Sequence, residues 1–187
     1  LDRFLRIFLY ILLFFFKTFP FTIDSMCDIM LSNNGTELDR LAIINSIYIK
    51  AFGSSCQDAS YSSFLDQMKA TDWNSSAAVG GRQWIYQTCV EFGYFQSTVS
   101  NFIFDSTQPV QFFIQQCMDI FGPQFNGGMV NDAVANTNNE YGGFNYQGSR
   151  VVFVNGDVDP WHALSFTISA PNPNTTALFI NGTAHCR

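Results

Sequence analysis

One short apolar run near the C-terminus constrains the fold of this chain more than any other feature. Residues 151–154 are four apolar, mostly β-branched residues, and an Asn-Gly turn pair follows at once, which is typical of a short buried strand. A helical or irregular segment after Trp161, a Pro- and Asn-rich loop over 170–176 and a second strand-like run over 177–180 come next. This alternation predicts a parallel sheet, and therefore an α/β fold.

Helices are expected before this alternation begins. Thr36 and Asp39 resemble a capping pair, and the apolar residues after them recur at helical spacing. Similar spacing predicts further helices over 61–70, 109–121 and 129–139, the second of which is stopped by a Gly-Pro pair. The simplest interpretation of these apolar faces is packing, so the chain places helices first and a sheet last.

Two side chains beyond the strand-like runs suggest chemistry. Asp159 follows the first run, and His185 follows the second run after a glycine-containing turn. Open α/β sheets place catalytic groups beyond the carboxyl ends of their strands, and α/β-hydrolases carry their triad in the chain order Ser, Asp, His. We therefore expect Asp159 to fix the tautomer of His185, which takes the proton of a serine hydroxyl. The alternative is that both residues are structural.

The other titratable residues nearby support weaker hypotheses. His162 is too near Asp159 in sequence for the two-loop geometry of a triad, so it ranks below His185 as the base. A metal-dependent hydrolase using Asp157, Asp159, His162 and His185 is disfavoured, because the histidines lack the i, i+4 pairing that zinc sites commonly use. We expect no metal and no cofactor.

Charge and cysteine usage narrow the class of protein. The net charge is −6, and the nine Lys and Arg residues form no cluster, so nucleic-acid binding is not expected. Five cysteines without a CxxC pair argue against a zinc ribbon. Together with four Asn-x-Ser/Thr sequons they predict a secreted or lysosomal glycoprotein, the alternative being chance in an Asn-rich chain. The sequons begin at Asn34, Asn74, Asn174 and Asn181.

Loop size favours two disulfides. Pairing Cys27 with Cys56, and Cys89 with Cys117, closes loops for which cross-linking contributes about 3 kcal/mol. Cys186 is then left over.

Composition sets the segment 1–19 apart. Two arginines precede an unbroken apolar run over 7–16, which is shorter than the roughly 20 residues of a membrane span and fits the apolar region of a signal peptide. No small-residue cleavage site follows. The segment is therefore either signal-like or a non-native stretch joined to a globular fragment, and no stable membrane span is expected.

Three motifs resemble those of one peptidase family. They are RQWIYQTCVEFGYFQST from Arg82, NGDVDPWHAL from Asn155 and GTAHC from Gly182. They resemble the C-terminal motifs of the prolyl carboxypeptidase and dipeptidyl peptidase II family of serine peptidases, especially its thymus-specific serine protease branch. The resemblance implies that Asp159 is the catalytic acid and His185 the catalytic histidine. It also implies an α/β-hydrolase domain interrupted by a helical cap, with many members cleaving peptides after proline.

The same resemblance suggests a domain plan. Residues 20–80 would be the end of the cap, and 81–187 the return into the hydrolase sheet, truncated after the histidine motif. The family nucleophile lies in a G-x-S-x-G-like elbow, which this sequence does not contain. We therefore expect the C-terminal half of a serine-type exopeptidase, carrying acid and base but no nucleophile. The alternative is a non-catalytic secreted glycoprotein or an inactive truncated homologue.

Aromatic residues of the motifs are candidates for binding a peptide substrate. Trp84 and Tyr94 in the first motif and Trp161 in the second are expected to line a pocket, the alternative being core packing. The resemblance implies that Glu91 binds a peptide amino terminus, although it could instead pair with Arg82. A homodimer of the full-length enzyme is also compatible with the family resemblance.

Overall fold

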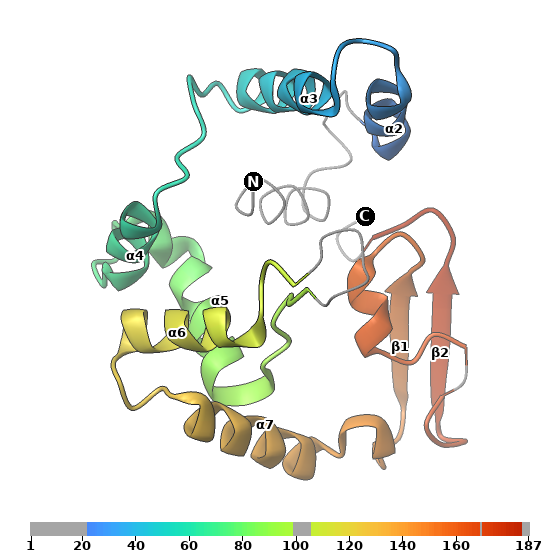
Figure 1. Cartoon of the computed structure of the whole chain (residues 1–187). Helices are drawn as coiled ribbons and strands as arrows, with labels where there is room; N and C mark the ends of the chain where they lie inside the picture. Colours follow the sequence, from blue (N-terminus) through green and yellow to red (C-terminus); the bar gives the residue numbers. More distant parts are fainter. Residues whose placement is uncertain (1–21, 99–105, 169, 185–187) are drawn as a thin grey trace.

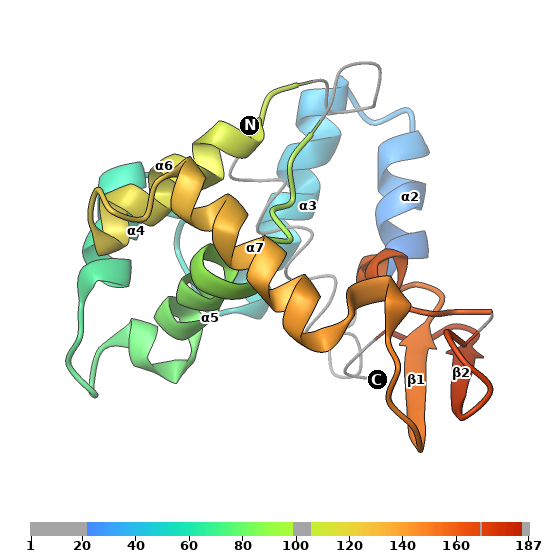
Figure 2. The same cartoon turned by 90° about the horizontal axis from the view of Figure 1, so that it is seen from below.

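The computed structural model describes residues 22–98, 106–168 and 170–184, and it places helices first and a parallel sheet last (Figure 1). Four of the helices, α4 to α7, lie together on the side away from the two strands, and the view from below shows α7 leading towards β1 (Figure 2). The α/β class predicted from the sequence is confirmed in this form. Among the described residues, none of the helices is long and apolar enough to cross a membrane.

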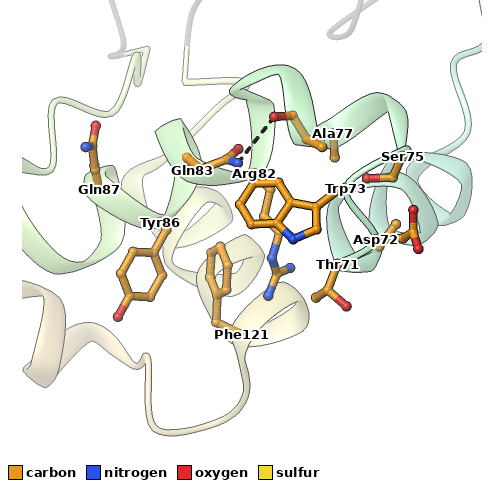
Figure 3. Close-up of a pocket in the computed structure, with 12 residues that line it drawn as sticks. Thr71, Asp72, Trp73, Ser75, Ala77, Arg82, Gln83, Tyr86, Gln87 and Phe121 are labelled. Carbon is orange, nitrogen blue, oxygen red and sulfur yellow. Dashed lines mark hydrogen bonds between the residues drawn. The ribbon is translucent and has the colours of Figure 1, made fainter.

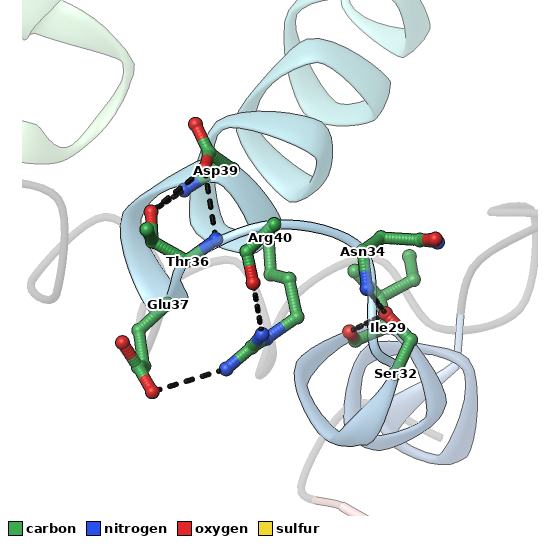
Figure 4. Close-up of polar contacts among 8 residues, drawn as sticks. Ile29, Ser32, Asn34, Thr36, Glu37, Asp39 and Arg40 are labelled. Carbon is green, nitrogen blue, oxygen red and sulfur yellow. Dashed lines mark hydrogen bonds and ion pairs between the residues drawn. The ribbon is translucent and has the colours of Figure 1, made fainter.

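Helices α2 (Ile23–Leu31) and α3 (Glu37–Ala51) form a pair whose starts are set by local capping. The predicted box at α3 is present, because Asp39 N–H donates to Thr36 Oγ1 while the Thr36 N–H and hydroxyl donate to Asp39 Oδ2 (Figure 4). In the same turn Arg40 donates to the Gly35 carbonyl oxygen at 2.8 Å. Helix α2, capped at Thr22, was not predicted.

The next helices surround a small core. They are α4 (Tyr61–Lys69), the 3₁₀ turn η1 (Ser76–Val79), α5 (Gly81–Gln87), the π-helical turn η2 (Thr88–Phe92), α6 (Val110–Phe121), α7 (Gly127–Tyr141) and the 3₁₀ turn η3 (Gly143–Asn145). The predicted disulfide Cys89–Cys117 is confirmed, with 5.9 Å between its Cα atoms. It is buried with Val130, and the partly buried residues around it are Ile85, Val90, Phe95, Phe121 and Phe125.

The second predicted disulfide is wrong. Cys27 and Cys56 are both free and exposed. Cys27 lies within α2, whereas Cys56 lies beyond the far end of α3, which is a rigid helix of 15 residues. Loop length estimates the benefit of a cross-link, but a bridge also needs Cα atoms within roughly 7 Å, which loop length does not ensure.

Strands β1 (Val151–Gly156) and β2 (Thr175–Ile180) pair in parallel, with Val151 opposite Thr175 and Gly156 opposite Ile180. On one face, Phe153 packs against Tyr146 and Phe166. The other face is exposed, so the expectation of a buried strand is only half correct. Its apolar residues are Val152 (56% exposed), Val154 (59%), Leu178 and Ile180.

Candidate active site

Asp159 lies where β1 leads into a short 3₁₀ helix, η4 (Pro160–Leu164). Its carboxylate accepts the Trp161 N–H at 3.0 Å, which satisfies one of the unpaired donors at the start of η4. Pro160 fits the first helical position, because it has no N–H to satisfy. Asp159 is only 3% exposed and follows the end of β1, and its role as the acid stays a prediction.

The segment that leaves β2, residues 181–184, is held against the turn that leaves β1. Asp157 N–H donates to the Ile180 carbonyl oxygen and Val158 N–H to that of Thr183. The Asp157 carboxylate in turn accepts the Gly182 N–H at 2.7 Å. A side chain at Gly156 would overlap the Thr183 carbonyl oxygen, so glycine is required there. This segment, which we call the β2 exit segment, leads directly to His185, which lies outside the described residues.

Four aromatic rings meet beside the Asp159 turn, and we call them the aromatic cluster: Trp84, Phe92, Tyr94 and Trp161. The ring centroids of Trp84 and Trp161 are 5.7 Å apart in an edge-to-face arrangement. Tyr94 lies 6.4 Å from Trp161 and 5.2 Å from Phe92, which is 5.4 Å from Trp84. Three of the four predicted substrate residues are therefore brought together next to the predicted acid.

Unusual backbone places Tyr94 at the edge of this cluster. The π-helical turn η2 ends at Gly93, which has φ 67° and packs closely on Val134. Tyr94 itself has φ 53°, a left-handed conformation that is rare for a bulky residue. Its ring is 46% exposed. π-Turns and such backbone outliers occur preferentially at functional sites.

Glu91 does not join the aromatic cluster. In η2 it faces α7, where its carboxylate accepts the Thr137 hydroxyl at 3.1 Å. Its pairing with Arg82, the alternative interpretation, is not found. Arg82 donates instead to the Met68 carbonyl oxygen, and its guanidinium lies 4.7 Å from the centre of the Phe121 ring.

Comparison with known proteins assigns the chain to a family. A family model described as serine carboxypeptidase S28 matches residues 16–187. The chain belongs to the S28 family. The resemblance found in its three motifs is therefore confirmed, and with it a serine peptidase ancestry.

Two S28-like relatives show how much of such a protein this chain represents. It is 37% identical over 169 residues to a Caenorhabditis elegans protein named "putative serine protease", covering 87% of this chain and 32% of the relative. It is 32% identical over 177 residues to the thymus-specific serine protease of Mus musculus, covering 89% and 33%. The chain thus spans about a third of the length of these curated relatives. No solved structure matches it.

This S28 chain also has a pocket away from Asp159. It has a volume of about 450 Å³ and lies between the α4–α5 connection, α5 and α6, with the Arg82 side chain between Trp73 and Phe121 (Figure 3). Arg82 and Tyr86 line it from one face of α5, whereas Trp84 leaves the opposite face towards the aromatic cluster. The pocket and the cluster are therefore on different sides of α5.

The predicted glycosylation sites of the S28 chain are accessible to solvent. The four sequon asparagines are exposed: Asn34, Asn74, Asn174 and Asn181.

The His162 ring packs edge-on against Phe179, and within the described ranges its buried Nδ1 has no hydrogen-bond partner. Sequence reasoning considered Asp157 only as a metal ligand. Its contact with Gly182 depends on the register of β1 and β2, which the sequence does not reveal.

Proposed function

We propose that this chain supplies the acid, Asp159, and the base, His185, of a Ser-Asp-His triad in a serine-type exopeptidase, a carboxypeptidase or dipeptidyl peptidase for which cleavage after proline is one candidate specificity. One observation carries the proposal: Asp159 is buried at the carboxyl end of β1, beside a hydrogen-bonded β2 exit segment that leads to His185. In parallel sheets this edge is where catalytic groups converge.

The chemistry follows from these roles. One oxygen of Asp159 holds the Trp161 N–H, which fixes the orientation of the carboxylate. The carboxylate then accepts the Nδ1 proton of His185, so Nε2 is free to take the proton of a serine hydroxyl and later to return it to the leaving amine. Because Asp159 is shielded from water, its charge stabilises the imidazolium more strongly than an exposed carboxylate would. The serine and the oxyanion donors come from sequence outside this chain.

The aromatic cluster is the proposed binding surface for the substrate. Tyr94 is 46% exposed and lies beside Trp161, which contacts Trp84, so the cluster offers aromatic surface of the kind that binds a proline ring or another apolar side chain. Glu91 is assigned the peptide amino terminus, which requires its Thr137 contact to be exchanged on binding. Residues 20–80 belong to the cap in this proposal.

A secreted or lysosomal location completes the proposal. It is supported by the exposure of the four sequon asparagines and by a disulfide buried in the core, since such bridges persist in oxidising compartments.

The test uses the complete open reading frame that contains this chain. Asp159→Asn is expected to fold normally and to lower turnover of a proline-containing peptide by on the order of 10⁴, because the imidazole adopts the wrong tautomer. Asp132→Asn, on the exposed surface of α7, is the matched control and keeps full turnover. Unchanged turnover in folded Asp159→Asn would remove this residue from the mechanism.

A non-catalytic glycoprotein is the second candidate, favoured by the absence of G-x-S-x-G from the 187 residues. The two candidates differ in how the product of the complete open reading frame reacts with a fluorophosphonate probe. Stoichiometric labelling supports the peptidase, whereas a folded product that stays unlabelled supports the second candidate.

A further inference from the structure

We propose that Asp157 is a positioning residue for the acid–base pair, because its carboxylate sets the distance between the Asp159 turn and the segment that carries His185. This inference rests on the triad role proposed above for Asp159 and His185. It assigns to Asp157 a task distinct from both of theirs.

The contacts across this edge are of two kinds. Asp157 N–H to Ile180 and Val158 N–H to Thr183 are backbone hydrogen bonds, which most residues at these positions would form. The contact from Gly182 N–H to Asp157 Oδ1 at 2.7 Å needs a side chain with an oxygen at this length. An N–H bound to a carboxylate forms a stronger hydrogen bond than a neutral pair. Asp157 therefore supplies the side-chain-specific part of the connection.

The conformation of the β2 exit segment explains why it needs this acceptor. Gly182 has φ 70°, so the chain turns sharply immediately after β2 ends. Thr183 donates its hydroxyl back to the Ile180 carbonyl oxygen at 3.0 Å, which closes the turn from its own side. Asp157 connects this turn to β1. Without Asp157, the turn keeps its shape but loses its strongest contact with the neighbouring strand.

The two acids of the turn after β1 have different contacts and therefore different proposed roles. Asp157 points to the β2 exit segment and Asp159 is buried under η4, where it binds Trp161. Asp157 and Asp159 lie in the same short turn, and His185 follows Thr183 by two residues in the sequence, so we expect a shift of the β2 exit segment to displace His185 from Asp159. Misplacing catalytic groups by about 1 Å lowers rates by on the order of 10²-fold.

The first test measures the histidine directly and needs no nucleophile. The chain has two histidines, so proton NMR gives two imidazole titration curves, and His185→Gln assigns them. A neighbouring carboxylate raises the pKa of a histidine, so Asp159→Asn is expected to lower the titration midpoint of His185. Asp157→Ala is expected to lower it part of the way, whereas Asp157→Asn, whose amide oxygen still accepts from Gly182, keeps the wild-type midpoint.

The outcomes separate the two proposals. If Asp159→Asn leaves His185 unchanged, the triad proposal fails. If Asp159→Asn lowers the midpoint but Asp157→Ala does not, the triad stands and the positioning role is overturned. If Asp157→Asn acts as strongly as Asp157→Ala, the effect comes from the charge of Asp157 and not from its hydrogen bond, which also overturns the positioning role.

A kinetic test on the product of the complete open reading frame is independent of the spectra. Asp157→Ala is expected to lower kcat by about 10- to 100-fold with KM unchanged, and Asp157→Asn to restore kcat to within about threefold. If Asp157→Ala does not fold, Asp157→Glu replaces it, because it keeps the charge but moves the oxygens by one methylene. A loss that falls on KM with kcat preserved would show that Asp157 contributes to substrate binding instead.

Discussion

The helical part and the sheet part of this chain are stabilised to very different degrees. The helices from α5 to α7 bury a disulfide and Val130 within a ring of partly buried apolar residues. The sheet covers one face only partly, with Phe153 half-buried, while Val152, Val154, Leu178 and Ile180 on the other face are exposed. Parallel sheets are usually covered on both faces. The helical part thus has its own core, whereas the sheet part requires a covering surface that the described residues do not provide.

The comparison is instructive because the proposed acid belongs to the less stable part. Asp159 is buried by η4 and its surroundings even though the strand before it has an open face. The local geometry of the acid therefore depends on short-range contacts, not on a complete sheet. The following predictions test the two parts, and one of them compares the same substitution in both.

Removing the disulfide is expected to have the largest effect. Replacing Cys89 and Cys117 by Ser releases a cross-link spanning 28 residues, which costs about 3–4 kcal/mol of unfolding free energy. Replacing the exposed free cysteines Cys27 and Cys56 by Ser is the control and changes little. Urea unfolding followed by circular dichroism measures both. A larger loss in the control would contradict the assigned pairing.

The open sheet face is expected to drive self-association of the chain. Val154 and Leu178 are cross-strand neighbours on that face, so Val154→Lys with Leu178→Glu keeps a favourable pair while removing two apolar side chains. We expect the double variant to weaken association on the order of 100-fold, since each apolar side chain contributes roughly 1.5–3 kcal/mol when buried. Sedimentation velocity measures it. A wild-type chain that is monodisperse, monomeric and cooperatively unfolding would refute the expectation.

The same isosteric substitution in both parts gives a direct comparison. Val130→Thr places a hydroxyl in a core position that is 3% exposed and is expected to cost about 1–2 kcal/mol. Val154→Thr places it on the open face and is expected to change stability by less than about 0.5 kcal/mol. Both retain the β-branched shape. Equal losses in thermal unfolding would mean that the open face is covered in solution.

The last expected effect is local to α3. Thr36→Ala removes a cap and is expected to cost about 1 kcal/mol. Hydrogen bonds from the Thr36 N–H and hydroxyl hold the pKa of Asp39 below its ordinary value, and Arg40 adds a smaller effect. Ionised Asp39 therefore stabilises α3 above the ordinary pKa near 4, and this contribution is lost as the pH falls through the lowered pKa. The destabilisation by Asp39→Asn should shrink accordingly in acid, and a pH-independent difference would contradict this.

Local signals predicted much of the fold. The cap at Thr36 and the Gly-Pro pair after Phe121 mark the start of α3 and the end of α6, and the structure confirms both. Helix α2 was missed because its box uses Ser25 in place of the Glu or Gln that usually marks one. Helix α5 was not predicted either. It begins after Gly80, which has φ 115° and also ends η1.

The local structure around the candidate site could be predicted from the sequence, but its long-range contacts could not. The strand and the turn that carries Asp159 were predicted because a strand followed by a turn is a local pattern, whereas the role of Asp159 stays a prediction. The meeting of Trp84 with Trp161 joins segments far apart in sequence, and no local pattern contains that contact. The role of Asp157 depends on the pairing register of two strands. The domain limits at 19 and 80, the glycans and the role of His185 remain predictions.

The left-handed backbone at Tyr94 has a consequence for engineering. Such a conformation costs about 1–3 kcal/mol for a residue other than glycine, so Tyr94→Gly is expected to relieve a local penalty while removing the exposed ring of the aromatic cluster. A search for more heat-resistant variants would then favour loss of this tyrosine, and a search for better catalysts would favour keeping it. At this position, thermal tolerance and the proposed substrate recognition compete for the same residue.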